Sequence, residues 1–139
     1  MRLYVDVDDT LINWVYGNRK IWDKTFKAPV IRNYPLINSI INWQQACTDR
    51  EVVVWSGTGA EWASLAANTF FKDAIPIAFT GSKTRLLPVL TSVDWSIDDR
   101  EQKDRWYLKP FGKVFTPQGF IDYANTQNFQ KSEKTNSNS

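Results

Sequence analysis

The sequence predicts an α/β domain built on a mostly parallel sheet. Short apolar runs rich in β-branched and aromatic residues alternate with segments whose apolar residues repeat at helical spacing, as in β-α-β units. Several of the short runs end in carboxylate or hydroxyl side chains, and open parallel sheets place their ligand sites at such strand ends. The chain has 139 residues, which suffice for one continuous core. We expect one domain over 1–124 and a flexible polar tail over 125–139.

The first strand is expected at residues 3–5, where Leu-Tyr-Val forms an apolar run that leads directly into a polar cluster. That cluster holds Asp6, Asp8 and Asp9, followed by Thr10. Three carboxylates within four positions repel one another, and they are costly at the edge of a core. We therefore expect a cation or a reacting group to use them.

Residues 11–34 are both aromatic and basic. The segment contains five Lys and Arg residues against one acid, Asp23, and so has a formal charge of +4. Positions 14, 18, 21, 22, 25 and 26 would share one helical face, which predicts an amphipathic helix over part of the segment. We favour the simpler interpretation, a surface helix with a solvated basic side. The alternative is an electropositive flap that draws an anionic substrate toward the nearby acids.

The next helix is expected to open at Pro35, since proline suits a first helical position. Its apolar stripe extends to Cys47, which we interpret as a core residue rather than a nucleophile. Residues 51–55 then form the clearest buried strand, with the near-continuous apolar character of a parallel strand covered on both faces.

Ser56 and Gly57 follow this strand directly. Thr58 and Glu61 have the spacing of a capping box for the next helix, which would leave the Ser56 hydroxyl free at the strand end. Backbone N–H groups in such a glycine turn can face an anion.

The second half of the chain repeats this pattern. Residues 75–79 are expected to form a strand, 80–82 a turn, and Lys83 the start of a short helix. Residues 93–97 form another expected strand, which ends in the acid pair Asp98 and Asp99. The last expected elements are an edge strand at 114–115 and a helix beginning at Thr116-Pro117.

The composition narrows the possible chemistry. The chain has no histidine, which excludes Ser-His-Asp and Cys-His nucleophile systems and zinc sites that use histidine. A single cysteine excludes an internal disulfide, so we expect a cytoplasmic protein. No apolar run approaches the ~20 residues of a membrane span, nothing resembles a signal peptide, and no obligate protein partner is evident.

A parallel sheet would gather the strand-end side chains at one edge. The side chains expected there are Asp6 and Asp8, Ser56, Lys83, and Asp98 with Asp99. Clustered carboxylates without histidine favour a hard cation, most plausibly Mg²⁺. A lysine and a hydroxyl beside that cation suit the non-bridging oxygens of a phosphoryl group. The sequence therefore predicts phosphoryl chemistry.

These residues resemble the motifs of the haloacid dehalogenase (HAD) superfamily over about residues 1 to 100. Asp6-Val-Asp8-Asp-Thr10 is similar to the first motif, Ser56 to the second, Lys83 to the third and Asp98-Asp99 to the fourth. The resemblance implies a three-layer Rossmann-like (HAD-type) domain without a large cap. It also implies that Asp6 is the nucleophile of an aspartyl-phosphate mechanism and that Asp8 is its general acid/base.

The resemblance further implies how the site binds its ligands. The phosphoryl group would lie on Ser56, Gly57 and Lys83, and the Mg²⁺ ligands would be Asp6, the backbone carbonyl of Asp8, and Asp98, with Asp99 as a further acidic partner. Lys72 and Lys103 are alternatives to Lys83. Family members often carry glycine where Asp9 stands.

The resulting hypothesis is an Mg²⁺-dependent phosphatase acting on a phosphorylated small molecule, a nucleotide or a nucleic-acid end. One alternative is a non-catalytic phosphate-binding or interaction module on the same fold. A receiver-type signalling domain is disfavoured, because its acid pair follows the first strand, whereas here the pair comes late. In a fourth interpretation the acids are simply solvated strand ends.

Overall fold

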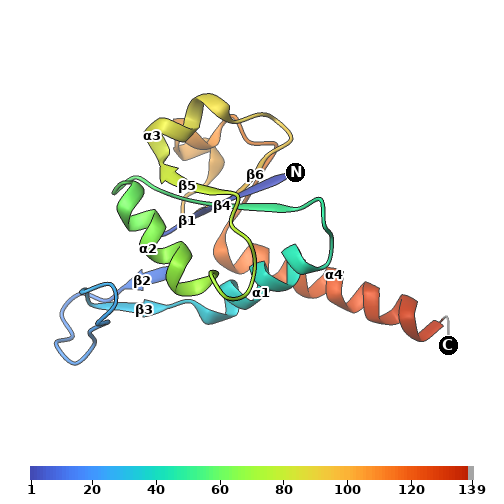
Figure 1. The fold of residues 1–139 in the computed structure, drawn as a ribbon, viewed down its shortest axis with the longest axis horizontal. Helices are drawn as coiled ribbons and strands as arrows, with labels where there is room; N and C mark the ends of the chain where they lie inside the picture. The colour runs from blue at the N-terminus through green and yellow to red at the C-terminus, as the bar shows by residue number, and fades with distance from the viewer. Residues whose placement is uncertain (138–139) are drawn as a thin grey trace.

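A five-stranded sheet forms the centre of the molecule (Figure 1). The computed structural model describes the backbone of residues 1–137 and the side chains of residues 1–127. All four pairings in this sheet are parallel, and the strand order is β5-β4-β1-β6-β7. The strands are β1 (Arg2–Asp6), β4 (Glu51–Ser56), β5 (Phe79–Ser82), β6 (Trp95–Ile97) and β7 (Lys113–Phe115). The predicted α/β class with a mostly parallel sheet is confirmed.

Strand β1 lies in the middle and pairs with β4 on one side and with β6 on the other. The chain proceeds outward from β1 through β4 to β5, and then returns to the other side of β1 for β6 and β7. The strand order therefore reverses beside β1. In open α/β sheets, ligands bind outside the carboxyl ends of the strands at such a reversal.

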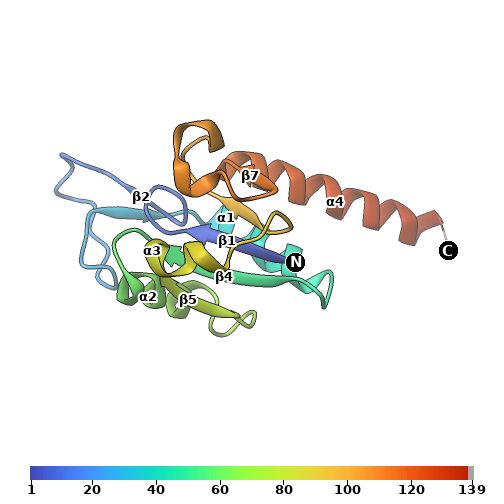
Figure 2. The same cartoon turned by 90° about the horizontal axis from the view of Figure 1, so that it is seen from above.

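Helices cover both faces of the sheet: in Figure 1 they lie above and below the strands, and Figure 2 looks down onto the upper layer. One face packs on α1 (Tyr34–Gln45), α2 (Ala60–Phe70) and α4 (Pro117–Ser137), and the other on α3 (Lys83–Leu86), η1 (Leu87–Val89) and η3 (Trp106–Leu108). The short η2 (Gln102–Asp104) contacts η3. Strand residues alternate between the two cores: Val5 and Val54 face the first, whereas Tyr4 and Trp55 face the second. This architecture is compatible with a Rossmann-like fold.

The segment between β1 and α1 is a hairpin, so the helix predicted within residues 11–34 is wrong. Its strands are β2 (Ile12–Trp14) and β3 (Val30–Arg32), which pair antiparallel. Ile12 and Val30 are buried, whereas the residues that follow each of them are exposed, which is the two-residue period of a strand. Gly17 has φ +83° and interrupts any helix through the connecting loop. We call β2, β3 and the loop 15–29 between them the hairpin arm.

Strand β5 begins at Phe79, four residues later than predicted, and includes the residues 80–82 that were expected to form a turn. Pro76 has no backbone N–H to donate to a sheet, which moves the strand beyond it. Helix α2 also differs from the expected capping box. Its N-cap is Gly59, and the Thr58 side chain does not cap the helix.

Helix α1 has Pro35 in its first turn, and α4 begins at Pro117, both as predicted. The helical backbone of α4 continues to Ser137, beyond residue 124, where the flexible tail was expected to begin. The flexibility of 125–139 stays a prediction, and residues 138–139 lie outside the described residues. None of the helices in the described part of the chain is long and apolar enough to cross a membrane.

Candidate active site

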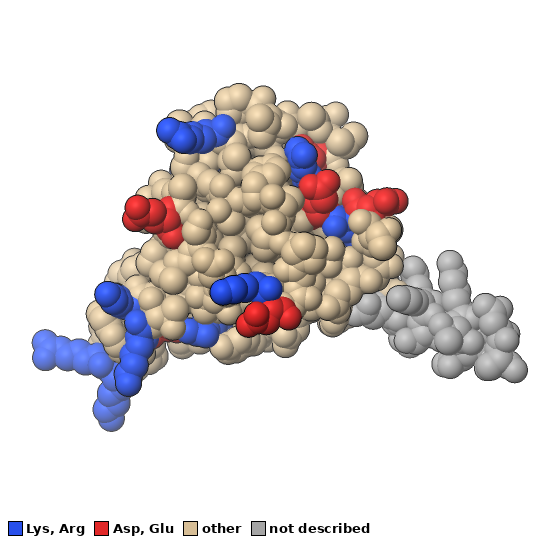
Figure 3. Space-filling model, viewed as in Figure 1, with Lys and Arg blue, Asp and Glu red and all other residues tan. Residues whose placement is uncertain are grey.

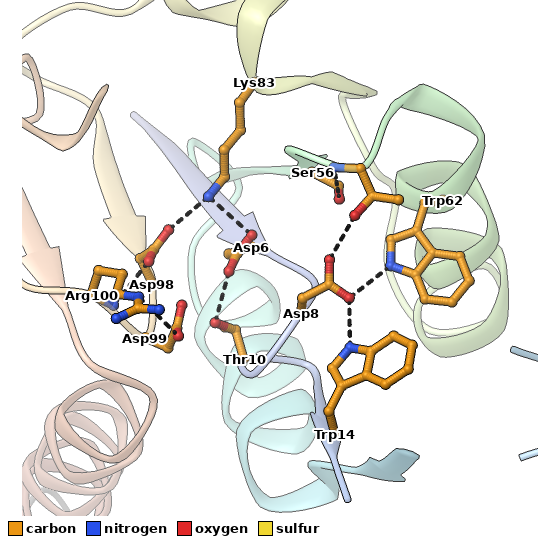
Figure 4. Close-up of polar contacts among 11 residues, drawn as sticks. Asp6, Asp8, Thr10, Trp14, Ser56, Trp62, Lys83, Asp98, Asp99 and Arg100 are labelled. Carbon is orange, nitrogen blue, oxygen red and sulfur yellow. Dashed lines mark hydrogen bonds and ion pairs between the residues drawn. The ribbon is translucent and has the colours of Figure 1, made fainter. Parts of the chain in front are cut away.

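Four strands deliver polar side chains to one edge of the sheet (Figure 4). Asp6 ends β1 and Ser56 ends β4, while Lys83 and Asp98 directly follow β5 and β6. Because all these strands run parallel, their carboxyl ends meet at the same edge. The structure thus brings together Asp6, Lys83 and Asp98, residues from distant parts of the sequence.

Lys83 lies at the centre of this cluster. Its Nζ is 3.1 Å from Asp6 Oδ1 and 3.0 Å from Asp98 Oδ2, and it lies 4.3 Å from the centre of the Tyr107 ring. Burial by itself lowers the pKa of Lys83, but the carboxylates of Asp6 and Asp98 outweigh it and the net pKa is raised. The two other lysines considered for phosphate binding, Lys72 and Lys103, do not belong to this cluster. Both are exposed, and Lys103 forms an ion pair with Glu101 at 3.3 Å.

Asp6 is 5% exposed, and its second oxygen accepts a hydrogen bond of 3.2 Å from the Thr10 hydroxyl. Burial raises the pKa of Asp6 to about 7; Lys83 opposes this shift, and the Asp98 charge adds to it. Near pH 7 the Asp6 carboxyl group is therefore about equally divided between its neutral and ionised forms, and a further cation at the site would favour the ionised form.

The two acids that follow β6, Asp98 and Asp99, differ in burial. Asp98 is fully buried, and its Oδ1 accepts a bond of 2.9 Å from the backbone N–H of Arg100. Asp99 is partly exposed, and its carboxylate lies 3.6 Å from Arg100 Nε. Burial, together with the neighbouring Asp98, raises the pKa of Asp99 to about 6.

The carboxylates of Asp6, Asp98 and Asp99 could hold a metal ion. One oxygen from each lies within 4.8 Å of the others. Oxygen donors of this kind suit Mg²⁺, which is often bound through one or two carboxylates and several waters. When the three acids are ionised, their charge exceeds that of the neighbouring Lys83 and Arg100. The donor set therefore fits the cation predicted from the sequence, although it is not specific for it.

The Asp8 side chain does not join this group. One of its oxygens accepts hydrogen bonds from the indole N–H groups of Trp14, at 2.9 Å, and Trp62, at 3.0 Å. The other accepts a bond of 3.0 Å from the Thr58 hydroxyl. Figure 4 shows the Asp8 carboxylate turned toward the two indoles, away from Asp98 and Asp99. The sequence did not predict this role of Trp14 and Trp62, because position 14 was expected on one face of a helix and no hydrophobic period indicates an indole N–H donor.

Asp9, which had no predicted role, shapes the turn after β1. Its backbone has φ 56°, in the left-handed region that glycine favours and that aspartate tolerates better than most residues. Its side chain accepts a hydrogen bond of 3.1 Å from the Trp14 backbone N–H, at the end of β2. Asp9 therefore positions the hairpin arm.

The turn from β4 into α2 completes the candidate site. The Ser56 hydroxyl is buried and accepts a bond of 3.0 Å from the Thr58 N–H, which leaves its own proton for another acceptor. Gly57 is exposed, and a Cβ added there would have no neighbour within 4 Å. Because α2 begins directly after this turn, the positive end of its dipole lies at the same edge of the sheet. The turn is suited to an anion.

Comparison of this chain with family models, with curated proteins and with solved structures finds no match. Any assignment of function therefore depends on the residues and geometry described above. The similarity of the four motifs to the HAD superfamily stays a prediction.

Proposed function

We propose that the protein is an Mg²⁺-dependent phosphatase of HAD type that hydrolyses a phosphomonoester through an aspartyl-phosphate on Asp6. The observation that carries this proposal is the buried cluster in which Lys83 bridges Asp6 and Asp98 beside the reversal in strand order. Phosphoryl transfer through an aspartyl-phosphate uses three kinds of group. They are a nucleophilic carboxylate, a lysine that binds the phosphoryl oxygens, and several carboxylates that together bind a hard cation.

In the first step, an oxygen of ionised Asp6 forms a bond to phosphorus while the bond between phosphorus and the ester oxygen breaks. The leaving oxygen takes a proton from Asp8. In the second step, water adds to phosphorus, gives a proton to Asp8, and displaces the Asp6 carboxylate as inorganic phosphate forms. Lys83, Ser56 and the N–H groups of the Gly57 turn would stabilise the charge on the phosphoryl oxygens.

The residues that would hold Mg²⁺ are Asp6, Asp98 and Asp99, together with the Asp8 carbonyl implied by the resemblance. A cation held there would neutralise charge on the phosphoryl oxygens. Asp6, whose pKa is raised by burial and by the charge of Asp98, would be more fully ionised beside such a cation and so better able to act as the nucleophile.

The test is hydrolysis of p-nitrophenyl phosphate with Mg²⁺ and with EDTA. We expect turnover that EDTA abolishes, a loss of at least ~10³-fold in Asp6→Asn, which removes the nucleophile, and no loss in Lys72→Ala, which changes an exposed lysine. If a folded, metal-replete protein fails to hydrolyse any member of a broad phosphomonoester panel, the proposal is wrong.

The second candidate, a non-catalytic phosphate-binding module, is favoured by the three hydrogen bonds that Asp8 accepts from Trp14, Thr58 and Trp62. To act as a general acid, Asp8 must instead carry a proton and direct it at the leaving oxygen. Binding of Mg²⁺ and a phosphate mimic without turnover would support this candidate, whereas phosphorylation of Asp6 would exclude it.

The cytoplasmic location expected from the sequence stays a prediction.

A further inference from the structure

The hairpin arm carries an excess of positive charge, formally +4. Its one acid, Asp23, is paired with Arg32 at 2.8 Å. Within the described part of the chain, the four other basic residues of the arm are exposed and form no ion pair: Arg19, Lys20, Lys24 and Lys27. Figure 3 shows Lys and Arg side chains gathered at this end of the molecule and extending from its surface.

The same arm exposes two aromatic rings. Tyr16 is 81% exposed and Trp22 is 60% exposed. Beside Trp22 lies a hollow of about 420 Å³, bounded by apolar Val15, Ile21 and Pro29 and by the basic side chain of Arg19. Its volume falls within the range of small-ligand sites. A planar ring that enters it would find apolar walls and a cation at the edge.

Stacked aromatic rings connect the arm to the candidate active site. The Tyr16 ring stacks on Trp14 at 5.9 Å with an angle of 14° between planes, and Trp14 stacks on Trp62 at 6.5 Å. Trp14 also donates its indole N–H to Asp8, two residues from Asp6. A further ring on the open face of Tyr16 would extend this stack away from the site.

We propose that the hairpin arm binds a single-stranded nucleic acid, whose bases stack on Tyr16 and Trp22 while its phosphates lie along the four cations. Alternating aromatic and cationic contacts of this kind bind single strands without reading sequence. Bases in a duplex are already stacked, so the strand must be single. An anionic membrane surface would meet the same cations but has no planar ring for the hollow. The further step, that the strand's terminal phosphate is the group attacked by Asp6, rests on the proposed function.

The test is fluorescence anisotropy with a 5′-phosphorylated, 3′-labelled oligothymidine of about eight nucleotides, within the site sizes known for single-strand binding. Wild-type protein is titrated in EDTA, so that binding is measured without turnover. We expect Trp22→Ala to weaken binding about 10-fold through lost stacking. Replacing Lys20 and Lys24 together by alanine should reduce the slope of log K against log salt by about 1.4, or ~0.7 per phosphate contact.

Trp106→Ala and Lys72→Ala are the matched controls, because each removes an exposed residue of the same type outside the arm. Both should bind like wild type. The proposal is overturned if wild-type protein does not bind the strand, if the control variants lose as much affinity as the arm variants, or if only phosphatidylserine vesicles bind and the arm variants abolish that binding.

The two proposals fail separately. A protein that hydrolyses p-nitrophenyl phosphate but does not bind the strand refutes the arm proposal alone. A protein that binds the strand through the arm but leaves every phosphomonoester intact supports the arm proposal and refutes the phosphatase.

Discussion

At the scale of single residues, Lys83 holds together two buried carboxylates that form no other ion pair within the described part of the chain. Asp98 is fully buried and Asp6 nearly so, and the ammonium of Lys83 contacts both. A buried charge that loses its partner keeps its desolvation cost without compensation. The same side chain therefore serves the stability of the metal-free protein and, in the proposed mechanism, the binding of the phosphoryl group.

Lys83→Met should destabilise the metal-free protein by about 3 kcal/mol, because it leaves two buried carboxylates without their cation. Methionine is chosen because it keeps most of the apolar part of the lysine side chain. The measurement is urea unfolding in EDTA near pH 8, above the Asp6 pKa of about 7. Lys72→Met, at an exposed position, should change the unfolding free energy by less than about 0.5 kcal/mol. Equal, small effects of the two substitutions would contradict the bridging role of Lys83.

Asp6 should make the metal-free protein less stable as the pH rises. Its pKa is about 7 in the folded protein against an ordinary 3.8, so between these values the native state binds more protons than the unfolded state. The unfolding free energy therefore falls across this window and stays low above pH 7. Asp6→Asn removes the titration, and it should be more stable than wild type by about 1 kcal/mol at pH 8 but not at pH 4.

This comparison needs urea unfolding of both proteins at the two pH values, in EDTA. Asp73→Asn, which changes an exposed acid, serves as the control and should follow wild type at both. A difference between Asp6→Asn and wild type that does not grow with pH would contradict the assigned environment of Asp6.

At the scale of elements, the strands were more predictable than the segments between them. The sequence of β4 is apolar almost throughout, and the sheet buries it on both faces, so local pattern and tertiary environment agree. The hairpin arm was not predictable in this way, because its aromatic residues also match a helical period. The hydrogen bond from Trp14 to Asp8, which connects β2 to the turn after β1, is a contact that no hydrophobic period encodes.

The hydrogen bond from Trp14 to Asp8 should help to hold the hairpin arm on the body of the protein. Trp14→Phe keeps an aromatic ring but removes the N–H donor, and a bond to a charged acceptor contributes about 1.5 kcal/mol or more. We expect amide hydrogen exchange in β3 to accelerate about 10-fold. Trp22→Phe, on the exposed part of the arm, is the control. Unchanged exchange in Trp14→Phe would show that Asp8 does not anchor the arm.

At the scale of the whole molecule, the strand order decides which strand ends become neighbours. The sequence placed Asp6, Lys83 and the acid pair at strand ends, and the parallel sheet brings them within contact distance as expected. The Asp8 side chain could not be placed in this way. Its partners Thr58 and Trp62 come from the β4–α2 region some fifty residues away, and only the packed structure brings them to it.

Mg²⁺ should stabilise the folded protein, because the three clustered carboxylates exist as a group only in the native state. At a concentration 100 times the Kd, binding adds about 2.7 kcal/mol to the unfolding free energy. The measurement is thermal unfolding with and without Mg²⁺. Asp98→Asn should lose most of the shift, whereas Asp73→Asn should keep it. A wild-type melting temperature that does not respond to Mg²⁺ would contradict a metal site here.

The central claim is that Asp6 forms a covalent bond to phosphorus. It is tested most directly by incubating the protein with Mg²⁺ and a ³²P-labelled phosphomonoester, quenching in acid, and mapping the labelled peptide. The account predicts a hydroxylamine-sensitive label on the peptide that contains Asp6, and no label in Asp6→Asn. Release of phosphate with no labelled intermediate, or with the label on another residue, would contradict it.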